Sequence, residues 1–393
     1  MNLIGEKRLL NQLTKLLVEK ALEAGPPRAS TPHGVGAILE TRGPAIEQGK
    51  NMSTELAVRP PYVPIIKWQK WEQRALCELT APVIGRVLPC LEIRDSSQHK
   101  TLLKALGTTW PHRVMVDYAN PDGILTSPRS EELREFCRQH PNAAAHVIPV
   151  INPRDTGALG KPKLMALLHG HRQVAYRLRV GPSHWMEDAL AALKSIKKYM
   201  TTPVGGALLI IDLGVTPTNW TNATVKAFGK TVTDCAGLGF ASVHVSSGSF
   251  PESLASVTGS GNFGRRDWQL WKALDAAIPT INVGFSDYGI LWPHWSETVL
   301  MRRGGKATIR YACADKWIIL KGNSLQKAES IAISQLMTTV YAAEFLGRAF
   351  SFGDRLIADR ANPTIPDKNK LCGHAHIAEG WTHHITFVVK KQY

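Results

Sequence analysis

Long hydrophobic runs are missing from this sequence. None of its stretches approaches the roughly 18 uninterrupted apolar residues of a membrane-spanning helix. The amino terminus also lacks the pattern of a secretory signal, in which basic residues precede an apolar run and a small-residue cleavage site. We therefore expect a cytoplasmic protein with no membrane contact.

Cysteine is scarce and scattered. None of the six cysteines belongs to a CxxC pair, which argues against a disulfide framework and against a zinc ribbon. We expect these side chains to act mainly as small buried hydrophobic groups. They stand at Cys77, Cys90, Cys137, Cys235, Cys313 and Cys372.

Several familiar catalytic motifs are also absent. The sequence contains neither the GxSxG elbow of serine hydrolases nor the GxxxxGK[ST] loop that cradles phosphates. Residues 259–264 (GSGNFG) have the glycine spacing of a dinucleotide-binding loop, but they do not open a βαβ unit from a strand. These motifs therefore do not indicate which reaction, if any, the protein catalyses.

A strong positive charge is present. The formal net charge is +15, which favours anionic partners and makes their binding sensitive to salt. Phosphates, nucleotides and nucleic acids are the ligands that this charge suggests. The alternative is a charge that serves solubility alone, and no dense Lys/Arg tail decides between the two.

The pattern divides the chain into three parts. Residues 1–24 carry Leu and Ile at helical spacing between Lys and Glu, which predicts an amphipathic helix. Residues 25–61 lose this periodicity and are rich in Gly, Pro, Ser and Thr, which predicts a flexible linker. We expect the folded domain to span residues 62–393.

Short apolar runs alternate with helical patterns from Tyr62 onward. Because the runs are almost continuously apolar, they fit a parallel sheet covered by helices. Eight repeats of strand and helix predict an α/β fold, a TIM-like (β/α)8 barrel, with a doubly wound open sheet as the alternative. The predicted strands are 62–67, 87–93, 113–118, 145–151, 174–180, 207–213, 240–246 and 280–286, and the predicted helices include 71–80, 131–140, 186–199 and 222–238.

Further elements are expected from about residue 305. Residues 307–311 and 316–321 predict a β-hairpin, residues 325–347 a helix, and residues 384–389 (HITFVV) a last strand. We expect these additions to cap one mouth of the barrel.

Polar residues stand at the ends of nearly all the predicted strands, where the active sites of such barrels lie. Carboxylates beside Lys and Arg can act as acid and base, or hold a divalent cation while the basic groups hold phosphate. The alternative is a set of ion pairs that only seals the barrel end. The candidate catalytic residues are Lys67, Glu92, Asp117, Asp212 and Asp287.

Other polar and aromatic residues are candidates for ligand binding. The segment Ser246–Pro251 has the hydroxyl groups and the glycine of an oxyanion cradle, and Arg with aromatic side chains can clamp a phosphate and stack a base. The alternative for the aromatic residues is burial in the core. The candidates are Arg177, Arg179, Ser246, Ser247, Ser249, Arg266, Tyr288, Arg310, Tyr311, Trp317, Lys321, Asp354, Trp381 and His384.

A divalent cation, Mg²⁺ or Zn²⁺, is compatible with the sequence but not demanded by it. On a strand, Cys372, His374 and His376 would share one face, and His383 or His384 would complete a zinc site. The Asp and Glu residues at the strand ends would instead suit magnesium.

Over roughly Tyr62 to Val389 the chain resembles the phage and bacterial beta protein family. The matching pieces are YVPIIKWQKWEQRAL, PCLEIR, VDY, IPVI, LLIIDL, SSGSFPES, RRDW, SDYG, IRY, W-x-x-x-K-G, FSFGD and W-x-H-H-I. Where the family pattern has Arg-x-Glu, this chain has Arg265, Arg266 and Asp267, which puts a role for Asp267 in doubt. The matching polar positions are Lys67, Glu72, Glu92, Asp117, Asp212, Ser247, Ser249, Arg266, Asp287, Tyr288, Arg310, Tyr311, Trp317, Lys321, Asp354, Trp381 and His384.

The resemblance implies an accessory protein of phages, mobile elements or phage-defence regions, in some cases encoded beside a small nuclease-like partner. Our main hypothesis is a barrel mouth that binds or processes a nucleotide or a nucleic-acid end. One alternative is a non-catalytic recognition subunit that holds a partner protein such as a nuclease, since a fold does not imply chemistry. Another is a nucleic-acid binder that uses basic surface alone.

Overall fold

The computed structural model describes residues 59–153, 159–180, 206–295 and 305–393, together with residues 191, 193 and 194. The predicted amino-terminal helix (1–24), nearly all of the predicted linker (25–61) and most of the predicted helix 186–199 lie outside the described residues.

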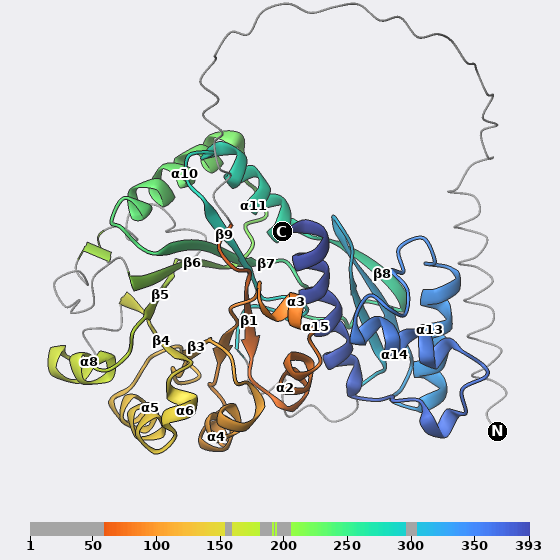
Figure 1. The fold of residues 1–393 in the computed structure, drawn as a ribbon. Coiled ribbons are helices and arrows are strands. Elements are labelled where there is room, and N and C mark those ends of the chain that lie inside the picture. Colours follow the sequence, from red (N-terminus) through yellow and green to blue (C-terminus); the bar gives the residue numbers. More distant parts are fainter. Residues whose placement is uncertain (1–58, 154–158, 181–190, 192, 195–205, 296–304) are drawn as a thin grey trace, which may run out of the picture. The chain divides into compact units, whose positions relative to one another are not determined.

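Eight parallel strands close into a barrel (Figure 1). Every predicted barrel strand overlaps an observed one. The first strand pairs with the last, which confirms the (β/α)8 barrel and excludes the open sheet. In order around the barrel the strands are β1 (Val63–Lys67), β2 (Cys90–Glu92), β3 (Val114–Asp117), β4 (Val147–Ile151), β5 (Val174–Arg179), β6 (Ala207–Val215), β7 (Ser242–Gly248) and β9 (Val283–Asp287).

Helices follow the strands and cover the outside of the barrel (Figure 1). Their apolar sides pack on the outward side chains of the strands, as in α10, where Val225, Phe228 and Val232 are buried. Thr221 caps the start of α10 by accepting a hydrogen bond from the Thr224 amide. The helices are α2 (Lys70–Cys77), α3 (Ala81–Ile84), α4 (His99–Thr109), α5 (Ser127–Gln139), α6 (Pro141–Ala144), α8 (Lys161–Leu168), α10 (Asn222–Ala236) and α11 (Arg266–Ala277).

A separate three-stranded antiparallel sheet lies beside the barrel (Figure 1). Strands β10 (Thr308–Ala312) and β11 (Lys316–Lys321) form the predicted hairpin. The third strand, β8 (Gly259–Gly264), is the glycine-rich segment GSGNFG, which pairs with β11 along its whole length. This strand was not predicted, because glycine is uncommon inside strands. It is inserted in the connection between β7 and α11.

The carboxyl-terminal part of the chain is helical. Helices α13 (Lys327–Thr339) and α14 (Phe352–Ala361), the short 3₁₀ turn η3 (Asp367–Asn369) and α15 (Ala375–Phe387) follow the sheet, and the π-helical turn η4 (Val388–Gln392) continues α15. The predicted helix 325–347 is therefore shorter than expected. The predicted last strand, 384–389, is wrong.

The burial of α15 explains this error. Every residue of α15 except Ile377 is buried, because the helix packs against α2, β10 and α14. A helix enclosed on all sides has a continuous apolar run like that of a buried strand, so periodicity does not distinguish the two. None of the helices in the described part of the chain has the length and apolar character to cross a membrane.

Candidate functional site

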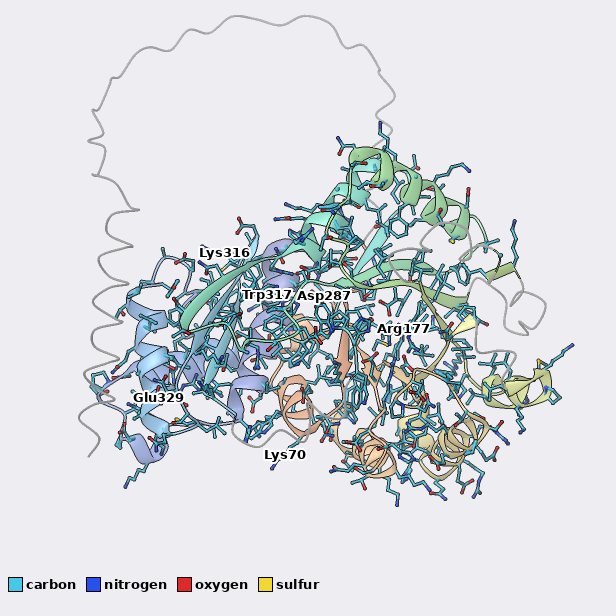
Figure 2. The ribbon with its side chains drawn as sticks, turned by 180° about the vertical axis from the view of Figure 1, so that it is seen from behind. Lys70, Arg177, Asp287, Lys316, Trp317 and Glu329 are labelled. Carbon is cyan, nitrogen blue, oxygen red and sulfur yellow. The ribbon has the colours of Figure 1, made fainter. Side chains whose placement is uncertain are left out.

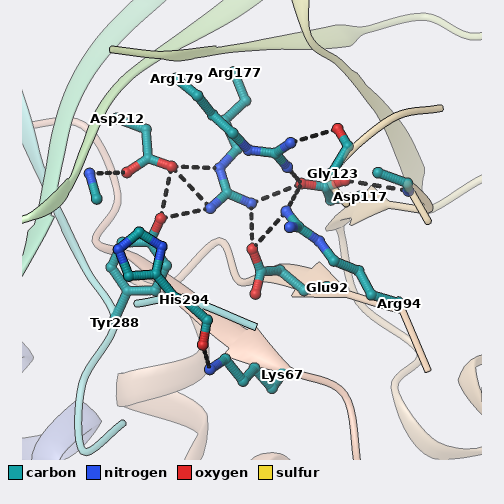
Figure 3. Close-up of polar contacts among 12 residues, drawn as sticks. Lys67, Glu92, Arg94, Asp117, Gly123, Arg177, Arg179, Asp212, Tyr288 and His294 are labelled. Carbon is teal, nitrogen blue, oxygen red and sulfur yellow. Dashed lines mark hydrogen bonds and ion pairs between the residues drawn. The ribbon is translucent and has the colours of Figure 1, made fainter. Parts of the chain in front are cut away.

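The guanidinium of Arg177 lies inside the carboxyl end of the barrel and joins four strand ends. Its Nε donates to Asp212 Oδ2 at 2.9 Å, and its Nη2 donates to the Tyr288 hydroxyl at 2.7 Å. Its Nη1 donates to Glu92 Oε1 at 2.8 Å and to Asp117 Oδ2 at 2.6 Å (Figure 3). The structure thus brings together the predicted residues of β2, β3, β5 and β6, with Tyr288 directly after β9.

Two more arginines complete this network. Arg94 donates to Glu92 at 2.8 Å and to Asp117 at 3.1 Å, and Arg179 donates to Asp117 and to the Gly123 carbonyl. Three carboxylates therefore face three guanidiniums, and their formal charges cancel. We call Glu92, Arg94, Asp117, Arg177, Arg179, Asp212 and Tyr288 the arginine network.

The arginines keep these carboxyl groups ionised. Burial alone would raise the pKa of Asp212, but the Arg177 guanidinium and the Tyr288 hydroxyl lower it below its usual value. The Asp117 carboxyl has a pKa far below its usual range, because three arginines outweigh the effect of its burial. Carboxylates held in this way are weak bases at neutral pH, and the guanidiniums oppose a bound cation. These contacts favour the ion-pair interpretation of Glu92, Asp117 and Asp212.

Asp287 lies outside the barrel wall, not with the arginine network. Strand register aligns Asp212 with Ser246, and Ser246 with Ser286. Because side chains alternate along a strand, Asp287 points to the opposite face from these residues. In Figure 2 Asp287 lies near Trp317 of β11, whereas Arg177 lies within the barrel. Asp212 and Asp287, which were predicted to lie together, therefore lie in different environments.

The Asp287 carboxylate joins the barrel to α15. It accepts hydrogen bonds from the Tyr62 hydroxyl at 2.6 Å and from the Gly289 amide at 3.1 Å, and it lies 2.9 Å from His384 Nε2. The Arg265 guanidinium is 3.7 Å away. Burial would raise the pKa of Asp287, but His384 and Arg265 lower it below its usual value.

Asp354, Tyr311 and His383 form a third buried cluster beyond the sheet. The Tyr311 hydroxyl donates to Asp354 at 2.7 Å, and His383 Nδ1 lies 2.9 Å from the same carboxylate. Ser351 caps the start of α14 and also donates to Asp354. These predicted ligand residues are remote from the arginine network, and their contacts fasten α14 and α15 to β10.

The barrel mouth next to β1, β7 and β9 carries a different set of charges. Arg310 of β10 places its guanidinium 5.9 Å from the ring of Phe250, in the connection after β7. Its backbone lies close to Gly380 of α15, and the carboxyl group of Glu72, on α2, raises the pKa of Arg310 against the larger effect of burial. Arg310 is half-buried, and no described residue hydrogen-bonds its guanidinium.

Lys67, at the end of β1, is the second cation of this mouth. Its ammonium group donates to the Trp292 carbonyl at 2.8 Å. It also donates to the His294 carbonyl at 2.5 Å (Figure 3). It forms no ion pair with a carboxylate of the described residues, and burial lowers its pKa. We call Lys67, Glu72 and Arg310 the basic corner.

The remaining predicted ligand residues lie in several different parts of the structure. Ser249 donates its hydroxyl hydrogen to Asp267, so this hydroxyl is not available as a donor to an oxyanion. Ser247 only accepts a hydrogen bond from Thr216, so its own hydroxyl remains a donor. Ser246 Oγ is buried without a hydrogen bond from a described residue. Trp317 and Trp381 are fully buried, and Lys321 binds the Leu254 carbonyl.

Arg266 is part of an open hollow at the start of α10. The hollow has a volume of about 550 Å³ and is lined by Thr218, Trp220, Thr221 and Arg266, among others. Arg266 donates to the Pro217 and Thr218 carbonyls at the edge of this hollow. It therefore lies away from the arginine network.

The predicted zinc site does not form as the sequence suggested. Among the described residues, no group of three or more His, Cys, Asp or Glu side chains is placed to hold a metal ion. His376 belongs to helix α15, where its ring contacts Glu379 and Ser330. The strand that would have aligned Cys372, His374 and His376 is absent from this part of the described structure.

Sequence reasoning missed several residues of these clusters. Tyr62 and Arg265 contact Asp287, and Arg94 closes the arginine network. Arg94 stands two residues after Glu92, so strand alternation was a usable signal for it. No strand pattern pointed to Arg265, because its neighbour Trp317 belongs to the additional sheet and not to the barrel.

A family model described as Beta protein matches residues 62–390 of this chain. The chain belongs to the Beta protein family. This confirms the resemblance seen in the sequence and covers the entire barrel and the additional sheet. The strand ends of the barrel therefore lie within the family's domain.

Comparison with other proteins adds little about the site. No curated protein matches the chain. A solved structure described as an SrLDC mutant in complex with PLP is similar at 12% sequence identity, over 67% of this chain and 81% of that chain, with a TM-score of 0.34. A likeness this weak carries no argument about function.

Proposed function

We propose that this Beta protein binds a phosphate-bearing ligand, such as a nucleotide or a nucleic-acid end, at the basic corner of its barrel mouth. The observation that carries the proposal is Arg310, a half-buried side chain whose Nε is buried and donates to no described residue. A cation withdrawn from water without a partner is costly, and a phosphate group supplies the oxygen atoms that it needs.

The position of the basic corner supports the same ligand. Arg310 lies beside Phe250, in the connection after the seventh barrel strand, β7, and Lys67 at the end of β1 contacts carbonyls in the connection after the eighth, β9. Barrels of this type frequently bind phosphate at the loops after these two strands. Lys67 adds a second positive charge, which forms no ion pair with a described carboxylate, and the net charge of +15 attracts anions toward the molecule.

The arginine network favours recognition over turnover by the predicted carboxylates. Glu92, Asp117 and Asp212 are already held by guanidiniums, so they are poorly suited to remove a proton or to hold a cation. This observation supports the second candidate function, a cytoplasmic recognition subunit that senses a ligand and acts through a protein partner such as a nuclease. The setting in phage–host conflict rests on the family resemblance.

Thermal denaturation with ligands tests the proposal. We expect pyrophosphate or a nucleotide, with and without Mg²⁺, to raise the melting temperature of the wild type, since a ligand bound only by the folded state stabilises it. Arg310→Gln should lose this increase. Arg172→Gln is the matched control, because it removes the same charge from an exposed residue before β5, at the opposite end of the barrel. Equal increases in all three proteins would contradict the proposal.

A further inference from the structure

Residues 288–295 (YGILWPHW) follow β9 and contact the ends of its two neighbours in the barrel, β1 and β7. We call this segment the strap. It begins at Tyr288, whose hydroxyl lies between Arg177 and Asp212 in the arginine network. All residues of the strap are described, and none of them belongs to a helix or a strand. Side-chain contacts, and not a ladder of backbone hydrogen bonds, therefore hold it in place.

Two contacts hold the strap against the barrel mouth. On one side the Lys67 ammonium, at the end of β1, donates to the Trp292 carbonyl at 2.8 Å and to the His294 carbonyl at 2.5 Å (Figure 3). On the other side Pro293 packs on the end of β7. A Cβ atom on Gly248 would lie only 2.5 Å from Pro293 Cγ. Since β9 lies between β1 and β7, the strap spans the mouth between these two points.

Two buried hydroxyl groups lie one layer deeper in the barrel. Ser246 precedes Gly248 by two residues on β7, so their positions share one face of the strand, and the register aligns Ser246 with Ser286 of β9. Both serines are fully buried, and neither Oγ atom hydrogen-bonds a described residue. A hydroxyl buried without a partner loses the hydrogen bonds that it makes in water. Entry of water beneath the strap would restore them, which offsets part of the packing lost on opening.

We propose that the strap is a gate over the barrel mouth, latched by Lys67, and that it opens to admit molecules to the arginine network. With the strap in its observed position the network is closed to water on this side, and Glu92, Arg177 and Asp212 each expose 2% of their surface or less. The inference concerns access to the arginine network. It goes beyond the proposed phosphate site and does not depend on the ligand of that site.

A thiol placed beneath the strap measures how often the strap opens. In Ser246→Cys, iodoacetamide can alkylate position 246 only when the strap is open, and mass spectrometry of the peptides gives the rate. The native Cys235, a fully buried residue of α10, is the reference for global unfolding. Relative to the rates in the unfolded protein, we expect position 246 to react at least about tenfold faster than Cys235, because local opening needs less free energy than global unfolding. Equal relative rates would overturn the inference.

A second thiol position guards against a variant that does not fold. Ser286→Cys places the thiol on the neighbouring strand at the same depth, and the same excess over Cys235 is expected there. Equal relative rates at position 286 and Cys235 would contradict the gate in the same way.

Two further substitutions, each combined with Ser246→Cys, test how the strap is held. Lys67→Met keeps an unbranched apolar side chain but removes the ammonium group. It should raise the relative rate at position 246 about tenfold or more, because hydrogen bonds from a charged group are stronger than neutral ones. Gly248→Ala should also raise this rate, since the added methyl group displaces Pro293. Gly248 does not have a positive φ, so its backbone accepts alanine.

The matched control for the latch is Lys226→Met, which removes the same charge from an exposed residue of α10. It should leave the relative rate at position 246 unchanged. An unchanged rate in both Lys67→Met and Gly248→Ala would overturn the inference, as would an equal increase in Lys226→Met.

Discussion

Arg177 concentrates the buried charge of the barrel at a single side chain. Its guanidinium contacts three carboxylates and is itself only 1% exposed. The pairing is isolated from water, so its loss leaves carboxylates with too little positive charge beside them.

We predict that Arg177→Met lowers the free energy of unfolding by about 3–5 kcal/mol, the usual cost of breaking a buried ion pair. Denaturation by urea measures this change. Arg138→Met removes an exposed ion pair with Glu135 on α5, and it should cost less than about 1 kcal/mol. Similar values for the two variants would show that the arginine network is not structural.

His244 gives the stability of the protein a pH dependence. Burial lowers the pKa of this histidine from its usual 6.5 to about 4. The folded state then binds fewer protons than the unfolded state between these values, so stability is complete above pH 6.5 and decreases as the pH falls. We predict that His244 alone contributes a loss of about 2 kcal/mol between pH 7.5 and pH 5, measured by urea denaturation.

The control for this prediction is His244→Gln. Its amide keeps a donor for the Pro61 carbonyl, which His244 Nε2 contacts at 2.9 Å. The variant should lose about 2 kcal/mol less than the wild type over the same pH range. His376 and His384, whose pKa values burial also lowers, should still contribute in the same direction.

Sequence patterns predicted which residues line the strand ends better than they predicted which of these residues lie together. Glu92, Asp117, Arg177 and Asp212 were expected together and lie together. Asp287 was expected with them, but the register between strands places it on the opposite face. This register depends on the stagger of the closed barrel, which no single strand reveals.

At the scale of elements, α15 is the link between the barrel and the additional sheet. Its His384 contacts Asp287 of β9, while its His383 contacts Asp354 of α14. Glycine allows the close approach of α14 to α15, since a Cβ atom on Gly353 would lie 2.2 Å from the Glu379 carbonyl oxygen.

We predict that Gly353→Ala lowers the free energy of unfolding by about 1–3 kcal/mol, because backbone atoms must move to admit the methyl group. Thermal or urea denaturation measures the loss. Gly85→Ala is the control, since Gly85 has a φ of −63° and a Cβ there would meet nothing closer than 3.7 Å. An equal effect of both variants would contradict the predicted contact between α14 and α15.

Some helices and strands were easier to predict from the sequence than others. The barrel strands are buried on both faces, so their apolar runs stand out from the helices between them. The final helix was mistaken for a strand because it is enclosed on all sides, and β8 was missed because three of its six residues are glycine. Both errors concern tertiary surroundings, which override local propensity.

At the scale of the whole molecule, the repeated alternation of strand and helix was enough to predict a closed barrel. It did not predict that the additional sheet brings Arg310 beside the connection after β7. The basic corner therefore depends on two parts of the fold at once, and only the assembled structure shows it.

Binding of pyrophosphate, measured by isothermal titration calorimetry, tests the central claim most directly. We predict that the wild type and Arg172→Gln bind pyrophosphate with similar affinity, and that Arg310→Gln binds it at least tenfold more weakly, the effect of losing about 1.4 kcal/mol of binding free energy. Unfolding experiments on the same samples should show that Arg310→Gln is folded. Equal affinity of the wild type and folded Arg310→Gln, or no binding by the wild type, would contradict the account.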